Sequence, residues 1–179
     1  MRGYFGIGVE SISKPGNLGN LMRSAHAFGA SFFFAVAPAL PLGELRRSDT
    51  SDAARHLPVY SYGSVEEFSL PKGCRLVGVE LTEDAEALPS FFHPTAAAYV
   101  LGPERGSLSA EMQARCDHLV QIPTRFCVNL AIAGAIVMYD RMLTQGRFAR
   151  RAVGTHDEPE ALAEHIHGGP VIRRPNPQG

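Results

Sequence analysis

The sequence predicts an α/β fold, in which a mostly parallel sheet carries helices on both faces and forms a single domain. Short apolar runs alternate with polar or helix-forming segments along the chain, an order typical of parallel sheets. The run 31–37 is apolar and aromatic almost throughout, as expected of a strand that is buried on both faces. The chain of 179 residues is long enough to bury one substantial core.

The individual elements follow from this alternation. Strands are predicted at 6–9, 31–37, 57–62, 75–81, 96–101 and 118–122. A first helix is predicted over 17–28, because apolar residues recur every three or four positions between Asn17, a suitable N-cap, and Gly29, a suitable stop. The strongest helical pattern covers 128–143, and shorter helix-forming segments are expected at 65–70 and 109–115.

The last part of the chain differs in composition from the rest. The domain is expected to span 1–148, and 149–179 is expected to form a tail rich in arginine, proline and glycine. Within the tail, 157–167 is predicted to form a short helix, with Asp157 as its cap and Gly168 at its end.

Composition narrows the class of protein. The chain is 45% hydrophobic and 20% charged, as in soluble globular proteins, and no apolar stretch is long enough to cross a bilayer. Met1–Tyr4 leads directly into the first strand without the features of a signal peptide. The three cysteines show no Cys-x-x-Cys spacing, which disfavours a disulfide framework and a zinc site. We therefore expect a cytoplasmic protein with no membrane segment and no metal.

Three separated segments have the composition of a ligand site. The first, Asn17-x-Gly19-x-x-x-Arg23, combines a small polar residue at a helix start with a fixed cation. The second follows a buried strand and contains glycines whose backbone can approach a ligand closely; it comprises Leu101, Gly102, Glu104 and Gly106. The third leads from a strand into the long helix and comprises Ile122, Pro123, Cys127, Val128 and Asn129. In open α/β sheets, ligands bind where strands end.

In this order, the three segments resemble the motifs of the SpoU/TrmH family of SPOUT methyltransferases, over roughly 6–143. The resemblance implies a C-terminal trefoil knot, a homodimer and S-adenosyl-L-methionine bound in the knot. Hydrophobic pattern alone would not predict a knot, because knots are almost absent from proteins. The implied activity is methyl transfer to a ribose 2′-hydroxyl of RNA. tRNA is favoured because the chain is as short as the tRNA-specific members, and rRNA is the alternative.

The resemblance also implies the roles of individual residues. Arg23 is the residue that handles the ribose hydroxyl, and because arginine keeps its proton at accessible pH, we expect it to position charge rather than act as a base. Asn17, Glu104 and Asn129 are expected to orient Arg23 or the ribose, and Cys127 completes the catalytic set. The positions expected to bind the cofactor are Val79, Leu101, Gly102, Ile122 and Val128.

One departure from the family pattern leaves a second hypothesis open. Cys127 stands where family members usually carry serine, and a thiol is the weaker hydrogen-bond donor. The alternative is therefore a non-catalytic RNA-binding or ribosome-associated module on the same scaffold. In either case, RNA phosphates are expected to contact arginines of the last helix and tail, namely Arg141, Arg147, Arg150, Arg151, Arg173 and Arg174.

Overall fold

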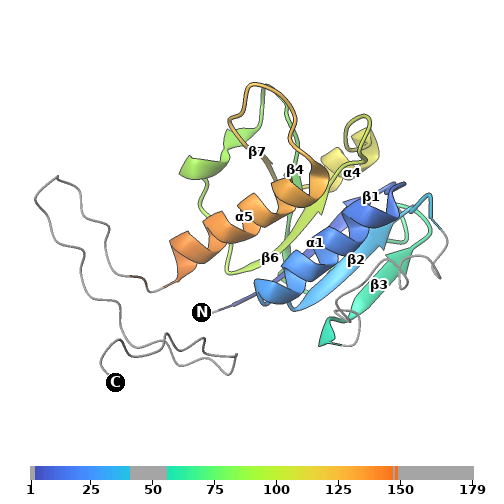
Figure 1. Ribbon diagram of the computed structural model, residues 1–179, viewed down its shortest axis with the longest axis horizontal. Coiled ribbons are helices and arrows are strands. Elements are labelled where there is room, and N and C mark those ends of the chain that lie inside the picture. The colour runs from blue at the N-terminus through green and yellow to red at the C-terminus, as the bar shows by residue number, and fades with distance from the viewer. Residues whose placement is uncertain (1–2, 41–55, 147, 149–179) are drawn as a thin grey trace, which may run out of the picture. The chain divides into compact units, whose positions relative to one another are not determined.

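The computed structural model describes residues 3–40, 56–146 and 148, and these residues contain a seven-stranded sheet of order β3-β2-β1-β6-β4-β7-β5 (Figure 1). Each pairing between these strands is parallel. The strands are β1 (Tyr4–Glu10), β2 (Phe32–Val36), β3 (Val59–Tyr62), β4 (Arg75–Val79), β5 (Glu86–Ala87), β6 (Ala96–Leu101) and β7 (His118–Gln121). The predicted α/β fold with a parallel sheet is confirmed.

Helices cover both faces of the sheet, as predicted. Helices α1 (Pro15–Ala27) and α5 (Leu130–Gln145) lie side by side on one face (Figure 1). The core beneath them includes Ile7, Leu21, Tyr99 and Val137. The short helix α4 (Ala110–Arg115) contributes Met112 to a second core on the opposite face, which also contains Phe34, Phe68 and Val100.

The central strand β1 has glycines on the face that packs against aromatic residues. A Cβ at Gly6 would overlap the ring of Phe32, and a Cβ at Gly8 would overlap the backbone and ring of Phe34. The two phenylalanines therefore occupy the space above β1 that side chains would otherwise fill. This arrangement explains why the first predicted strand alternates glycine with large apolar residues.

Helix α1 ends where the sequence predicts but begins earlier. Its N-cap position is Lys14, and Pro15 occupies the first turn, where its missing N–H group costs no hydrogen bond. The prediction of Asn17 as the cap is therefore wrong. At the other end, Gly29 has a φ of +73° and its N–H donates to the His26 carbonyl, while the Ala30 N–H donates to Ala25. This pattern is a Schellman motif.

Other segments differ from the prediction. Residues 65–67 form a turn and 68–70 are irregular, where a helix was expected, and β5 and the short 3₁₀ helix η1 (Leu88–Ser90) were not predicted. The long helix α5 begins at Leu130 rather than 128. None of the helices in the described ranges combines the length and apolar character needed to span a bilayer. The predicted tail, its helix at 157–167 and Arg147 lie outside the described residues, and the domain boundary and the knot stay predictions.

Candidate active site

A cavity of about 310 Å³ lies at the carboxyl ends of β4, β6 and β7. Its lining combines the exits of these strands with the first turns of α1 and α5. Nine of the ten residues predicted from the sequence line it: Asn17, Val79, Leu101, Gly102, Glu104, Ile122, Cys127, Val128 and Asn129. The structure thus brings the three motif segments together at one place, and the roles of these residues stay predictions.

Glu104 holds the start of α1 through a full set of hydrogen bonds. One carboxylate oxygen, Oε2, accepts from the Ser13 N–H at 3.2 Å and from the Ser13 hydroxyl at 2.9 Å. The other, Oε1, accepts from the Lys14 N–H at 3.0 Å and from Asn17 Nδ2 at 3.1 Å. Because an ionised carboxylate offers about four acceptor positions, these four donors saturate it.

The same hydrogen bonds affect the ionisation of Glu104. Partial burial alone raises the pKa of this carboxyl, but hydrogen bonds from its own backbone amide, Ser13 and Asn17 outweigh burial and hold the pKa below its ordinary value. Glu104 is therefore ionised at neutral pH.

Asn129 and Asn17 extend this network to α5. Asn129 is the N-cap of α5, and its Oδ1 accepts from the Ala131 N–H at 2.9 Å and the Ile132 N–H at 3.4 Å. Its Nδ2 donates to Asn17 Oδ1 at 3.0 Å. Backbone amides only donate and a carboxylate only accepts, so the two ends of the network fix the orientation of both asparagine amides. One directional chain, Asn129 to Asn17 to Glu104, joins all three motifs.

Two further carboxylates, which the sequence analysis did not select, hold the loop after β6. The Leu108 N–H donates to Glu80 Oε2 at 2.7 Å, and Ser109 donates to Glu10 through its N–H at 2.8 Å and its hydroxyl at 2.6 Å. Glu10 is only 3% exposed, and Glu80 also lines the cavity. Each is an acidic residue at the end of a predicted apolar strand, a signal that was present in the sequence.

Arg23 lies apart from the other predicted catalytic residues. It is exposed on α1 and does not belong to the residues that line the cavity. Six positions separate it from Asn17, which at about 100° per residue leaves the two side chains about 120° apart around the helix axis. The spacing of the first motif therefore directs its amide and its cation to different faces of α1.

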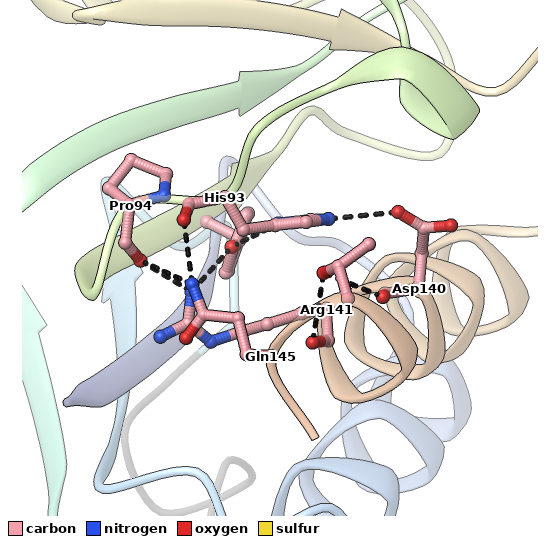
Figure 2. A network of polar contacts seen from close by, with 7 residues as sticks. His93, Pro94, Asp140, Arg141 and Gln145 are labelled. Atoms are coloured by element: carbon pink, nitrogen blue, oxygen red, sulfur yellow. Dashed lines mark hydrogen bonds and ion pairs between the residues drawn. The ribbon is translucent and has the colours of Figure 1, made fainter. Parts of the chain in front are cut away.

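The prediction that Arg141 contacts RNA is wrong, because its side chain is fully buried (0% exposed). Its guanidinium donates to the carbonyls of Pro94 at 2.6 Å and Thr95 at 2.9 Å, and to the Tyr99 hydroxyl at 3.2 Å. Figure 2 shows this network of polar contacts, which includes the carbonyl of Pro94 and side chains of α5. These contacts attach α5 to the segment that leads into β6, at the amino end of the strands.

His93 extends the network around Arg141. Its Nδ1 lies 2.6 Å from the Tyr99 hydroxyl and its Nε2 lies 2.9 Å from Asp140 Oδ2 (Figure 2). Burial raises the pKa of Tyr99 to about 12 and lowers the pKa of His93. Among the described residues, no three potential metal ligands of the His, Cys, Asp or Glu type form a group that could hold an ion.

Comparisons with known proteins agree on one family. The model of the SpoU rRNA Methylase family matches residues 5–139. The chain is 31% identical over 140 residues to the 23S rRNA (guanosine-2′-O-)-methyltransferase RlmB of Coxiella burnetii, a match that covers 74% of this chain and 55% of that protein. The chain thus spans about half the length of this relative.

Solved structures show the same fold. An rRNA methyltransferase from Sinorhizobium meliloti, solved with bound AdoMet, superposes with a TM-score of 0.71 at 23% identity, covering 81% of this chain and 58% of that one. A structure concerning 2-OH methylation of C/U34 on tRNA gives a TM-score of 0.66 at 25% identity, covering 80% of this chain and 93% of that one.

Proposed function

Because the chain belongs to the SpoU rRNA methylase family, we propose that it transfers a methyl group from S-adenosyl-L-methionine to a ribose 2′-hydroxyl of RNA. The observation that carries this proposal is the convergence of the three motif segments on one cavity, joined by the hydrogen-bond chain from Asn129 to Glu104. The names of the relatives, an rRNA guanosine-2′-O-methyltransferase and a structure of tRNA 2-OH methylation, support the same chemistry.

The cavity suits the cofactor in size and lining. Small-molecule sites start at about 300 Å³ and combine apolar walls with a few polar groups. Val79, Leu101 and Ile122 supply apolar walls for an adenine ring, and a Cβ at Gly102 would lie only 2.9 Å from the Leu108 nitrogen. Glycine at this position lets the loop backbone at Leu108 pack directly against the strand exit that borders the cavity. When bound, S-adenosyl-L-methionine supplies an electrophilic methyl group.

The chain's own residues position the reactants. Glu104, with its acceptor positions filled, fixes Asn17 and the start of α1 and is not available as a base for the hydroxyl. Arg23, which is exposed on α1 outside the cavity lining, is placed to meet the RNA rather than the cofactor, and its permanent positive charge stabilises negative charge developing on the ribose oxygen. In this proposal, Asn17, Glu104 and Asn129 are positioning residues, Arg23 is the catalytic residue, and Cys127 contributes size rather than a strong donor.

The rim of the cavity supports RNA as the substrate. Lys14 lines the cavity, and Arg105 and Arg125 are exposed on the loops that border it. Phe126, beside Arg125, is 77% exposed, and an exposed aromatic ring next to cations is suited to stack a nucleobase. These residues replace Arg141 as the proposed phosphate contacts, and those predicted in the tail lie outside the described residues.

Homodimer formation belongs to the same proposal. Ile132 is 54% exposed and Tyr139 is 45% exposed, and their spacing of seven positions puts them on one face of α5. Such an apolar face supports contact with a second copy. Sedimentation of the full chain should show a species of twice the chain mass, and a monomer at micromolar concentration would contradict the dimer. The proposal also includes the trefoil knot that the family resemblance implies. It includes a cytoplasmic location as well, which the free cysteines support.

Replacement of Arg23 by alanine tests the proposal. Arg23→Ala should abolish transfer of labelled methyl groups to total RNA while leaving the affinity for S-adenosyl-L-methionine, measured by calorimetry, nearly unchanged. Lys72→Ala, which removes an exposed cation before β4, is the control and should keep full activity. Loss of cofactor binding in Arg23→Ala would contradict the assigned role. A wild-type chain that binds RNA but not the cofactor would instead support the non-catalytic module.

A further inference from the structure

Among the described residues, two glutamates line the cavity, and they differ in how many acceptor positions remain free. Glu104 receives two donors on each carboxylate oxygen and is saturated. Glu80 receives only one donor on each oxygen: the Leu81 N–H lies 2.9 Å from Oε1 and the Leu108 N–H lies 2.7 Å from Oε2. Each oxygen of Glu80 therefore retains about one unused acceptor position.

The place of Glu80 in the fold restricts what these positions can bind. Glu80 directly follows Val79 at the carboxyl end of β4, and Val79 and Leu101 form apolar walls of the cavity. In an adenosine whose base lies between these walls, the ribose is attached directly to the base. The ribose hydroxyls are then within reach of the strand exit, where Glu80 lies. The hydrogen bonds from Leu81 and Leu108 also fix the carboxylate before any ligand arrives, which reduces the entropy lost on binding.

We propose that Glu80 binds the vicinal 2′- and 3′-hydroxyls of the ribose in S-adenosyl-L-methionine, one hydroxyl on each carboxylate oxygen. This inference rests on the proposed function, since it assumes that the cavity holds the adenosyl group. Two neighbouring hydroxyl donors match the two neighbouring acceptor oxygens, and hydrogen bonds to an ionised group are stronger than those between neutral groups. Glu80 thereby makes the site selective for ribose over deoxyribose.

Calorimetric titration with S-adenosylhomocysteine and its 2′-deoxy and 3′-deoxy analogues tests the proposal without requiring activity. The wild-type chain should bind each deoxy analogue about ten- to a hundredfold more weakly than the parent, the value of one charge-assisted hydrogen bond. In Glu80→Ala, the ratio of affinities should fall close to one. The control is Glu83→Ala, which removes an exposed carboxylate three residues further on and should keep the wild-type ratio.

The ratio separates contact with the ribose from a purely structural role. If Glu80 only held Leu108, its removal would weaken all three ligands by the same factor and leave the ratio unchanged, which would overturn the proposal. Equal affinity of the wild-type chain for the parent and deoxy compounds would overturn it as well, while leaving the proposed function intact. A wild-type chain that binds none of the three would reject both. Should Glu80→Ala fail to fold, Glu80→Gln, which keeps an acceptor but loses the charge, should still lower the ratio severalfold.

Discussion

Asn129 offers a direct test of the hydrogen-bond chain, because its amide oxygen and its amide nitrogen make different contacts. Oδ1 caps α5 through the Ala131 and Ile132 amides, and Nδ2 donates to Asn17. Loss of an N-cap side chain costs about 1 kcal/mol, and loss of a neutral hydrogen bond costs about 1 kcal/mol more. Asn129→Ala should therefore lower the free energy of unfolding by about 2 kcal/mol, or the melting temperature by about 4 to 8 °C.

Aspartate at the same position separates the two effects. Aspartate caps helices as well as asparagine does, so Asn129→Asp keeps the cap of α5. The new carboxylate has no donor for Asn17, however, and if the Asn17 amide turned to donate to it, the Asn17 oxygen would face Glu104. We expect this variant to lose only about 1 kcal/mol, yet to lose the fixed orientation of Asn17.

Urea titrations of the three chains, followed by circular dichroism, measure these free energies. Activity on RNA and affinity for the cofactor are then measured without urea, at a temperature where all three are folded. Methyl transfer should fall in both variants, although their stabilities differ. Equal destabilisation by alanine and aspartate would refute the capping role, and wild-type activity in Asn129→Asp would refute the need for a directional chain.

Two further predictions concern charged groups in the fold. The pKa of Glu104 is held low in the folded chain, so its stabilising contribution is fully present above the unfolded value of about 4.3 and is lost as pH falls through the folded pKa. The difference in unfolding free energy between wild type and Glu104→Gln should therefore be constant from pH 7 to about 5 and shrink by pH 3; a difference that grows in acid would contradict this. Arg141→Met removes the guanidinium that donates to the carbonyls of Pro94 and Thr95 and to the buried Tyr99 hydroxyl, and at about 1 kcal/mol for each of these hydrogen bonds it should cost about 3 kcal/mol in urea titrations, without changing the salt dependence of RNA binding. A loss below about 1 kcal/mol, or a shallower salt dependence, would contradict the buried role.

The sheet could be predicted from local sequence because burial on both faces leaves a local pattern. Phe32–Val36 is buried at every position, and the apolar run that predicts it has no competing helical period. The prediction of a helix at 65–70 is wrong for a reason that the local sequence pattern does not contain. The Val65 carbonyl accepts from the Phe68 N–H at 3.2 Å, which closes a turn, and the carbonyls of Val65 and Phe68 also accept hydrogen bonds from Arg115, far along the chain. A tertiary contact thus holds this segment in a turn rather than a helix.

The start of α1 shows the same limit at the candidate site. Asparagine is a residue type that often caps helices, but the side chain of Asn17 forms hydrogen bonds with Glu104 and Asn129, which come from the other two motifs. The helix therefore begins at Pro15, and the residue that sequence assigns to a local role serves a long-range one. Family resemblance selected nine residues that line one cavity, with Arg23 outside it, because the resemblance carries this long-range information, whereas propensity alone does not.

Arg141 was misplaced although the sequence contained the signal for its burial. On α5, Gly134, Val137 and Met138 are buried, and Arg141 follows them at spacings of seven, four and three positions. The helical period therefore places the guanidinium on the buried face. The prediction that Arg141 contacts phosphate considered the residue type and not its position in the helical period. Tyr99, a lone hydroxyl within the apolar strand β6, required a buried partner and pointed to the same conclusion. A cation on the apolar period of a helix is thus better interpreted first as a buried hydrogen-bond donor and only then as a contact to nucleic acid.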